Sequence, residues 1–269
     1  MDFKNDINDL NPYKSNTISL IGKRLPQERD LYFKAKLDEL LNQYRAARVF
    51  MRECETSDWN HWISCTGDKT KEEIALLTFK SYFYEASLFY YNSVVDISWV
   101  LCYVSASSIC KGKTEAVDIS KMGTIDEAAS ELRLAERDVK CTSKYNSFEN
   151  LKKQCPEFSV PIEKVIEFSM PFLKSEIRKK YNFLKHRGRP YYSEIKAIKP
   201  CRPWEIFVED GKSKIYSELA TDITDVTYTF SLNESICELK DFDDNNLFPY
   251  LKELIVSIYE QVKPSPYIT

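Results

Sequence analysis

A basic stretch in the second half of the chain carries the side chains best suited to chemistry. Between residues 178 and 189, six of the twelve positions are Lys or Arg, and the same stretch contains Asn182 and His186. On a helix that advances 100° per residue, Asn182 and His186 are i, i+4 neighbours. Lys179 then lies on the same face, seven residues before His186, with Arg178 at the edge of that face. Cations of this kind can hold a phosphate, and an imidazole can transfer a proton near neutral pH.

These residues define the candidate site. We identify four candidate catalytic residues: Arg178, Lys179, Asn182 and His186. Three further cations are candidate substrate-binding residues: Lys185, Arg187 and Arg189. A structural interpretation competes with this one, because basic residues at a helix C-terminus interact favourably with the negative end of the helix dipole and a lone His can cap its carbonyl groups.

Two carboxylates on an earlier apolar segment are candidate supporting residues. Glu85, Asn92 and Asp96 are spaced i, i+7, i+11, which places them along one side of a helix. A buried carboxylate needs a partner, so Glu85 or Asp96 is expected to face the basic helix and to position Arg178 or His186. The alternative, which we favour for these two carboxylates, is a structural ion pair or a solvent-facing side of the helix.

The elements expected to position these residues are helical. Apolar residues recur at helical spacing over about 27–54, and again from about 70 to 110, where Thr70 and Glu73 form a capping-box pattern and Gly112 marks the end. The second segment is too long for a typical globular helix unless it is bent or broken. Thr124 and Glu127 predict another capped helix, which ends near Val139.

The candidate site belongs to the next helical region. We expect a short helix at about 148–154 and then a helix with Pro161 in its first turn. Pro171 predicts a kink or restart near Ser169, after which the helix continues to about Arg187. Gly188 and Pro190 end it.

The pattern changes after residue 190. Strands at 204–209 and 214–217 flank Asp210-Gly211, a strong hairpin signal, and 225–231 alternates as a third strand would. A last helix is expected from about Asn246 to Val262, after an acidic run at 241–244 that would favour its N-terminus. The prediction is therefore a mainly α bundle with a long central helix and a small β-hairpin insertion at about 191–231. We predict an N-terminal arm at 1–26 and a single domain at 27–269.

The composition excludes several classes of function. Lys and Arg total 38 and Asp and Glu total 41, so a nonspecific electrostatic attachment to nucleic acid or to an anionic membrane is excluded. Six Gly and two His leave little material for phosphate-binding loops or His-rich metal sites, and none of the eight Cys forms a C-x-x-C pair. We predict no cofactor, no metal and no membrane association. Free thiols and the lack of a secretory leader predict a reducing cytoplasm.

A resemblance to a known family adds to this interpretation. The segment Tyr84–Asn92, the segment Asp96–Trp99 and the later Asn182-Phe-Leu-Lys-His186-Arg-Gly188 resemble the HEPN superfamily (higher eukaryotes and prokaryotes nucleotide-binding), over about 27–188 and the last helix. The resemblance implies a helical bundle. Many members are metal-independent ribonucleases with an Arg-x4–6-His motif, often Arg-Asn-x-x-x-His, and two copies of the motif usually meet across a dimer. Members are frequent in toxin–antitoxin and antiviral systems.

The chain departs from that motif at its arginine. Tyr181 stands where the Arg before Asn182 is expected, and Arg178 lies one residue outside the permitted spacing from His186. Lys179 and Lys180 have the right spacing, but a Lys lacks the guanidinium fork that binds phosphate in two places.

The sequence therefore leaves two main functions open. The first is a HEPN-like, metal-independent endoribonuclease or RNA-binding protein of a bacterial defence or toxin system, with a homodimer, RNA and a cognate antitoxin or defence partner as its expected partners. The alternative is a non-catalytic HEPN-like module that dimerises and binds other proteins. A nucleotide-binding sensor is a weaker third interpretation.

Overall fold

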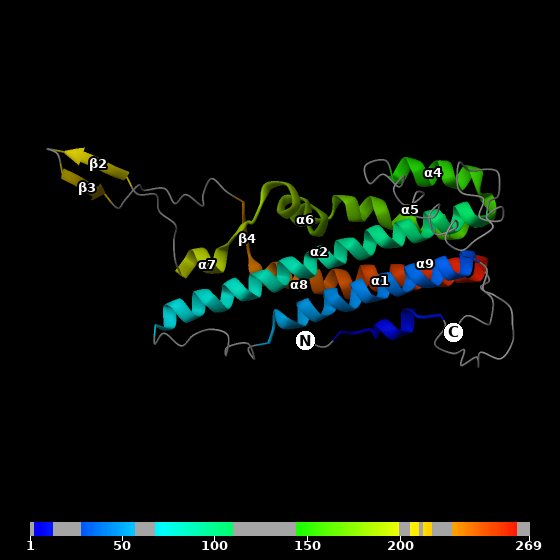
Figure 1. The fold of residues 1–269 in the computed structure, drawn as a ribbon, viewed down its shortest axis with the longest axis horizontal. Helices are drawn as coiled ribbons and strands as arrows, with labels where there is room; N and C mark the ends of the chain where they lie inside the picture. The colour runs from blue at the N-terminus through cyan, green and yellow to red at the C-terminus, as the bar shows by residue number, and fades with distance from the viewer. Residues whose placement is uncertain are drawn as a thin grey trace.

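The protein is mainly helical, which confirms the predicted all-α class (Figure 1). The computed structural model describes the following residues: 3–12, 28–56, 68–109, 144–198, 205–209, 212–216 and 228–262. The predicted helix at 124–139, the end expected at Gly112 and the Asp210-Gly211 turn lie outside these residues.

Two long helices form the centre of the bundle. Helix α1, Glu28–Glu53, and helix α2, Lys69–Ile109, lie side by side along most of their length (Figure 1). The 41 residues of α2 form one continuous helix, so the expected break is absent from it. Its N-terminus is capped by Asp68, whose Oδ1 accepts hydrogen bonds from the backbone N–H groups of Thr70 and Lys71 at 3.1 and 3.3 Å. The cap therefore lies two residues before the one that the sequence predicted.

The next helices lead to the candidate site. Helix α4, Lys144–Gln154, is followed by the 3₁₀ turn η5, Pro156–Phe158, and by helices α5, Ser159–Lys174, and α6, Glu176–Arg187. Pro161 lies in the first turn of α5, as predicted. Pro171, however, lies inside α5, and the break comes at Ser175 instead of near Ser169.

Ser175 supplies the physical reason for that position. Its backbone is extended, and its hydroxyl accepts a hydrogen bond from the backbone N–H of Arg178 at 3.2 Å while donating to the carbonyl of Phe172 at 2.7 Å. One side chain thus ends α5 and begins α6. A cap of this kind contributes about 1 kcal/mol, which favours a break here over a kink at the proline.

The segment after α6 contains more than the predicted strands. Strand β1, Tyr191–Tyr192, leads into a short helix, α7, Ser193–Ile198, and pairs in parallel with β4, Thr229–Phe230. Strands β2, Glu205–Glu209, and β3, Lys212–Tyr216, form the predicted antiparallel hairpin, which lies apart from the helices (Figure 1). The third strand was predicted, but it pairs with β1 and not with the hairpin.

The C-terminal helical region begins earlier than the sequence suggested. Helix α8, Leu232–Phe242, runs into a π-helical segment, η7, Asp243–Leu247, and then into α9, Phe248–Val262. The acidic residues at 241–244 therefore do not precede a helix. They lie within one, and Asp243 is fully buried. The expected favourable charge at the start of a last helix is thus wrong.

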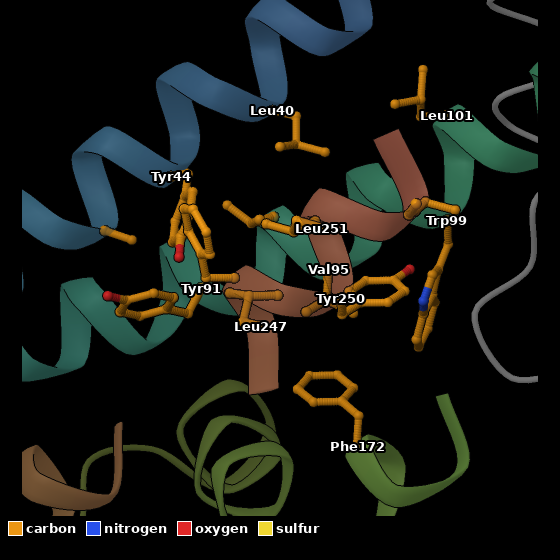
Figure 2. Close-up of a cluster of buried hydrophobic side chains, with 14 of the residues drawn as sticks. Leu40, Tyr44, Tyr91, Val95, Trp99, Leu101, Phe172, Leu247, Tyr250 and Leu251 are labelled. Atoms are coloured by element: carbon orange, nitrogen blue, oxygen red, sulfur yellow. The ribbon is translucent and has the colours of Figure 1, made fainter. Parts of the chain in front are cut away.

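A single apolar cluster joins α1, α2, α5 and α9 (Figure 2). Trp99 of α2 packs edge-on against Phe172 of α5, with ring centroids 6.1 Å apart, and Tyr250 of α9 hydrogen-bonds to Ser98 at 3.0 Å. Aromatic side chains bury 150–250 Å² each, so this cluster fixes how α5, and therefore α6, lies on α2.

Two further observations concern the predicted surroundings of the protein. None of the described helices, α2 included, combines the length and apolar character needed to cross a bilayer. Of the described cysteines, Cys54, Cys102 and Cys237 are free thiols, but Cys155 is disulfide-bonded, so the expectation that the cysteines are free fails at this position.

Candidate functional site

Helix α6 places its candidate residues on two different faces. Lys179, Asn182 and His186 are exposed and lie on the outer side, whereas the Arg178 side chain is buried against α2. The helix ends at Gly188, whose φ of 96° and ψ of −164° lie in a region that glycine alone adopts without strain. The chain can therefore turn away directly after Arg187, which leaves the end of α6 accessible.

Arg178 connects α6 to α2. Its Nη1 donates to the side-chain oxygen of Asn92 at 2.9 Å, and its Nη2 lies 3.8 Å from Oδ1 of Asp96. The guanidinium also lies over the rings of Phe172 and Tyr181, at 5.5 and 5.1 Å from their centroids. Asp96 thus faces the basic helix and pairs with Arg178, a contact that fits both the supporting role and the structural ion pair left open by the sequence. These contacts make Arg178 a residue that positions α6.

The outer face of α6 forms one wall of a groove, here called the α6 groove, of about 460 Å³. Its lining residues come from α6, from β4 and from the residue just before β4: Glu176, Lys179, Lys180, Asn182, Phe183, His186, Arg187, Tyr228 and Phe230. Three of the four candidate catalytic residues, together with Arg187, therefore share one concave surface, and Arg178 is not part of it.

The charges in the α6 groove are unequally engaged. Lys179 pairs with Glu176 at 2.6 Å, and both side chains are more than half exposed, so this pair is weak and easily exchanged. Lys180 is buried and bound to Glu238 and to the hydroxyl of Ser235, which keeps its charge within the fold.

Two side chains in the groove remain available to a ligand. Among the residues that the structure describes, the His186 side chain makes no hydrogen bond and the Arg187 side chain makes no ion pair. Lys179 can also bind an anion, because its pair with Glu176 is weak. The groove thus has two cations that can bind an anion, Lys179 and Arg187, and the His186 imidazole lies between them along α6.

The opposite wall of the groove is aromatic. Tyr228 is 57% exposed, and its ring lies 4.9 Å from that of Phe183 and under the Arg187 guanidinium at 5.9 Å. Phe230 closes the wall at 5.8 Å from Phe183. The sequence did not identify Tyr228 and Phe230 as site residues, because the alternation at 225–231 predicts a strand there but not its position beside α6.

The remaining candidate residues lie outside the groove. The Lys185 ammonium lies over the ring of Tyr181, and Arg189 binds Glu85 at 2.7 Å and the hydroxyl of Ser81. Glu85 also accepts a hydrogen bond from the Tyr192 hydroxyl at 2.9 Å. Glu85 thus holds the segment that follows α6, and it does not contact Arg178 or His186.

The residues of the groove can bind an anion next to the His186 imidazole. The groove offers two cations for a phosphate, one exposed imidazole for proton transfer, an amide for a hydrogen bond and aromatic faces for stacking. Within the described ranges, no group of three or more His, Cys, Asp or Glu side chains is arranged to hold a metal ion.

Comparison with known proteins adds no assignment. No protein-family model, no curated protein and no solved structure matches this chain.

Proposed function

We propose that the α6 groove binds single-stranded RNA and that His186 makes the protein a HEPN-like, metal-independent endoribonuclease. The observation that carries the proposal is the gathering of His186, Lys179 and Arg187 on α6, opposite the aromatic wall formed by Tyr228 and Phe230. Cations that follow a phosphate backbone beside aromatic rings that stack on bases are the usual means of binding single strands.

The proposed reaction is an internal transesterification. His186 removes the proton from a ribose 2′-hydroxyl, whose oxygen attacks the adjacent phosphorus. The bond from phosphorus to the 5′ oxygen breaks, which yields a 2′,3′-cyclic phosphate and a free 5′-hydroxyl. Lys179 and Arg187 stabilise the negative charge that develops on the phosphoryl oxygens. In the homodimer that the resemblance implies, the second copy of His186 protonates the departing 5′ oxygen.

Arg178 has a positioning role in this proposal. Its guanidinium is committed to Asn92 and Asp96, so the cation that accompanies His186 is Lys179. A lysine is a point charge without the bidentate geometry of arginine. We therefore expect slower cleavage than an arginine in the same place would support.

One observation favours the alternative of a non-catalytic protein-interaction module. Tyr82 and Phe89 of α2 are 49% and 54% exposed, and the Phe89 ring lies 6.2 Å from that of Tyr181 on α6. Large apolar side chains exposed together are typical of interaction surfaces. In this alternative, the face next to α6 binds a second copy or a cognate defence partner, and the groove holds no substrate.

The test is cleavage of a labelled single-stranded RNA in the presence of a metal chelator. We expect the wild-type protein to cleave it, His186→Ala to lose cleavage, and Lys252→Gln, an exposed lysine of α9 that does not line the groove, to keep it. Tyr228→Ala should weaken RNA binding roughly tenfold, since stacking of one base on an aromatic ring contributes about 1–3 kcal/mol. Undiminished cleavage by His186→Ala would refute the catalytic role.

Binding without cleavage would limit the function to RNA binding. An absence of both, together with a dimer that Phe89→Ser dissociates, would support the interaction module instead. Sedimentation of the wild-type and Phe89→Ser proteins distinguishes the last case, because the exposed Phe89 ring is outside the groove.

A further inference from the structure

A second concave surface lies on the N-terminal part of the chain, away from α6. It is formed between α1 and the segment that contains the 3₁₀ turn η1, Ile7–Leu10, which runs beside α1 in Figure 1. This arginine hollow encloses about 610 Å³. Its lining residues are Phe3, Asn5, Asp6, Ile7, Asn8, Arg45, Arg48, Val49 and Arg52. Its volume is within the range of small-molecule sites.

Three arginines line the hollow from one helix. Arg45, Arg48 and Arg52 follow one another at i, i+3 and i+7, so they lie within about 60° of one another around α1. The Cα atoms of Arg45 and Arg52 are separated by about 10 Å along the axis. Side chains as long as arginine can converge over that span, with Arg48 between them.

The middle arginine is fixed in place. Its Nε donates to Asp243 at 2.8 Å, its Nη1 to the backbone carbonyl of Asn5 at 2.5 Å, and its Nη2 to the hydroxyl of Tyr44 at 3.0 Å. These bonds use three of the five N–H groups of a guanidinium, which leaves two for a ligand in the hollow that Arg48 lines. The charge of Arg48 is offset by Asp243.

The outer two arginines have no carboxylate partner among the described residues. The Arg45 side chain donates only to the neutral side chain of Asn42, at 2.9 Å, and the Arg52 side chain makes no hydrogen bond or ion pair within the described ranges. The +2 charge of these two side chains exceeds the −1 charge of Asp6, which also lines the hollow and caps η1. In a chain with a net charge of −3, this hollow is a locally positive surface.

The far wall of the hollow is held by the π-helical segment. Its consecutive residues Asp243 and Asp244 project in different directions and reach α1 and the N-terminal segment respectively. Asp243 binds Arg48. The carboxylate of Asp244 accepts a hydrogen bond from the backbone N–H of Lys4 at 3.2 Å, and its backbone carbonyl accepts one from the side-chain amide of Asn5 at 3.4 Å. π-helical insertions occur frequently at functional sites, and this one secures both walls of the hollow.

We propose that the arginine hollow binds a small phosphate monoester, with Arg45 and Arg52 on the phosphate and an apolar part of the ligand against Val49 and Ile7. A doubly charged phosphate matches two arginines without carboxylate partners better than a singly charged phosphodiester does. Val49 is 54% exposed, and Phe3 lies over Arg48 at 4.5 Å, so the rim offers apolar surface beside the charge. The proposal is independent of the α6 groove.

The test is calorimetric titration of the full chain with phenyl phosphate and with methyl phenyl phosphate. The two probes share the aromatic ring, but only the first carries two charges near neutral pH. We expect phenyl phosphate to bind at least tenfold more tightly. We also expect the double variant Arg45→Gln/Arg52→Gln to weaken its binding at least tenfold. Lys252→Gln, an exposed cation on α9, should leave it unchanged.

Each of these comparisons has an outcome that would refute the proposal. No heat of binding at millimolar phenyl phosphate, or unchanged affinity in the double arginine variant, would exclude the site. Equal affinity for both probes would indicate a site for phosphodiesters, such as a nucleic acid backbone, and would refute the monoester. Arg48 is left intact in the variants because its removal would leave the buried Asp243 carboxylate without a cationic partner. A circular dichroism melt checks that the double variant remains folded.

Discussion

The buried contact between Arg48 and Asp243 allows a quantitative test of how the bundle is held together. The Arg48 side chain is 7% exposed and Asp243 is fully buried, and the Tyr44 hydroxyl donates to the same carboxylate. Arg48→Met keeps the apolar stem of the side chain but leaves a carboxylate without its cation. Removing one partner of a buried ion pair costs about 3–5 kcal/mol. That is a third or more of the free energy of unfolding of many domains, and it lowers the melting temperature by roughly 10 °C.

The pH dependence of this loss has a definite sign. Burial raises the pKa of Asp243, and the Arg48 guanidinium and the Tyr44 hydroxyl partly counter it. Without Arg48 the pKa of Asp243 rises further, so the folded variant holds a proton that the unfolded chain releases. Stability that depends on the bound proton is present at low pH and lost as pH rises through the folded-state pKa. The deficit of Arg48→Met should therefore widen between about pH 5 and pH 8.

Urea denaturation followed by circular dichroism at the two pH values measures both effects. The matched control is Arg45→Gln, an exposed arginine on the same helix, which should change the free energy of unfolding by less than about 0.5 kcal/mol. Adding Asp243→Asn to Arg48→Met removes the unpaired buried carboxylate and should restore part of the lost free energy of unfolding. A deficit below about 1 kcal/mol at neutral pH, with no recovery in the double variant, would show that the pair is not structural in this way.

Three further substitutions test local features of the fold by the same denaturation measurement. Gly188→Ala should cost about 1–3 kcal/mol, because φ of 96° strains any side chain although a new Cβ would meet no atom within 4 Å; a neutral effect would mean that the end of α6 relaxes freely. Ser175→Ala should cost about 1 kcal/mol by removing the cap of α6, and Ser175→Asp should restore it. Desolvation raises the pKa of Glu194, but hydrogen bonds from the backbone N–H groups of Asn233 and Leu232 outweigh it, so the pKa is lowered overall. Glu194→Gln should therefore destabilise the fold above about pH 5 and have no effect on stability in acid. An equal effect at all pH values would contradict the charge-based explanation.

The features that the sequence predicted are those specified by neighbouring residues. Both ends of α1 and the C-terminal end of α6 agree with expectation because their apolar spacing and Gly188 act within one or two turns. Helix α8 was missed because the acidic run at 241–244 resembles the start of a helix. In the structure, this run continues α8 through a π-helical segment, whose wider turn disrupts the 3.6-residue period on which the prediction relied.

The same division applies to the α6 groove. The grouping of Lys179, Asn182 and His186 was predictable because it depends only on helical spacing. The aromatic wall was not, because Tyr228 reaches the groove only through the pairing of β4 with β1, across nearly 40 residues of chain. A parallel pairing between short strands leaves almost no local signal.

The position of Arg178 shows how the fold decides between neighbours that the sequence treats alike. Arg178 and Lys179 are consecutive, so on α6 they point about 100° apart, and of the two only Lys179 lines the groove. The apolar face of α6 packs on α2, where Asn92 and Asp96 lie one turn apart and both contact the Arg178 guanidinium. Because a buried cation must be paired, the partners on α2 determine which of the two faces inward. Lys179 is thereby left beside His186, and any chemistry in the α6 groove must proceed with a lysine where the resembling family has an arginine.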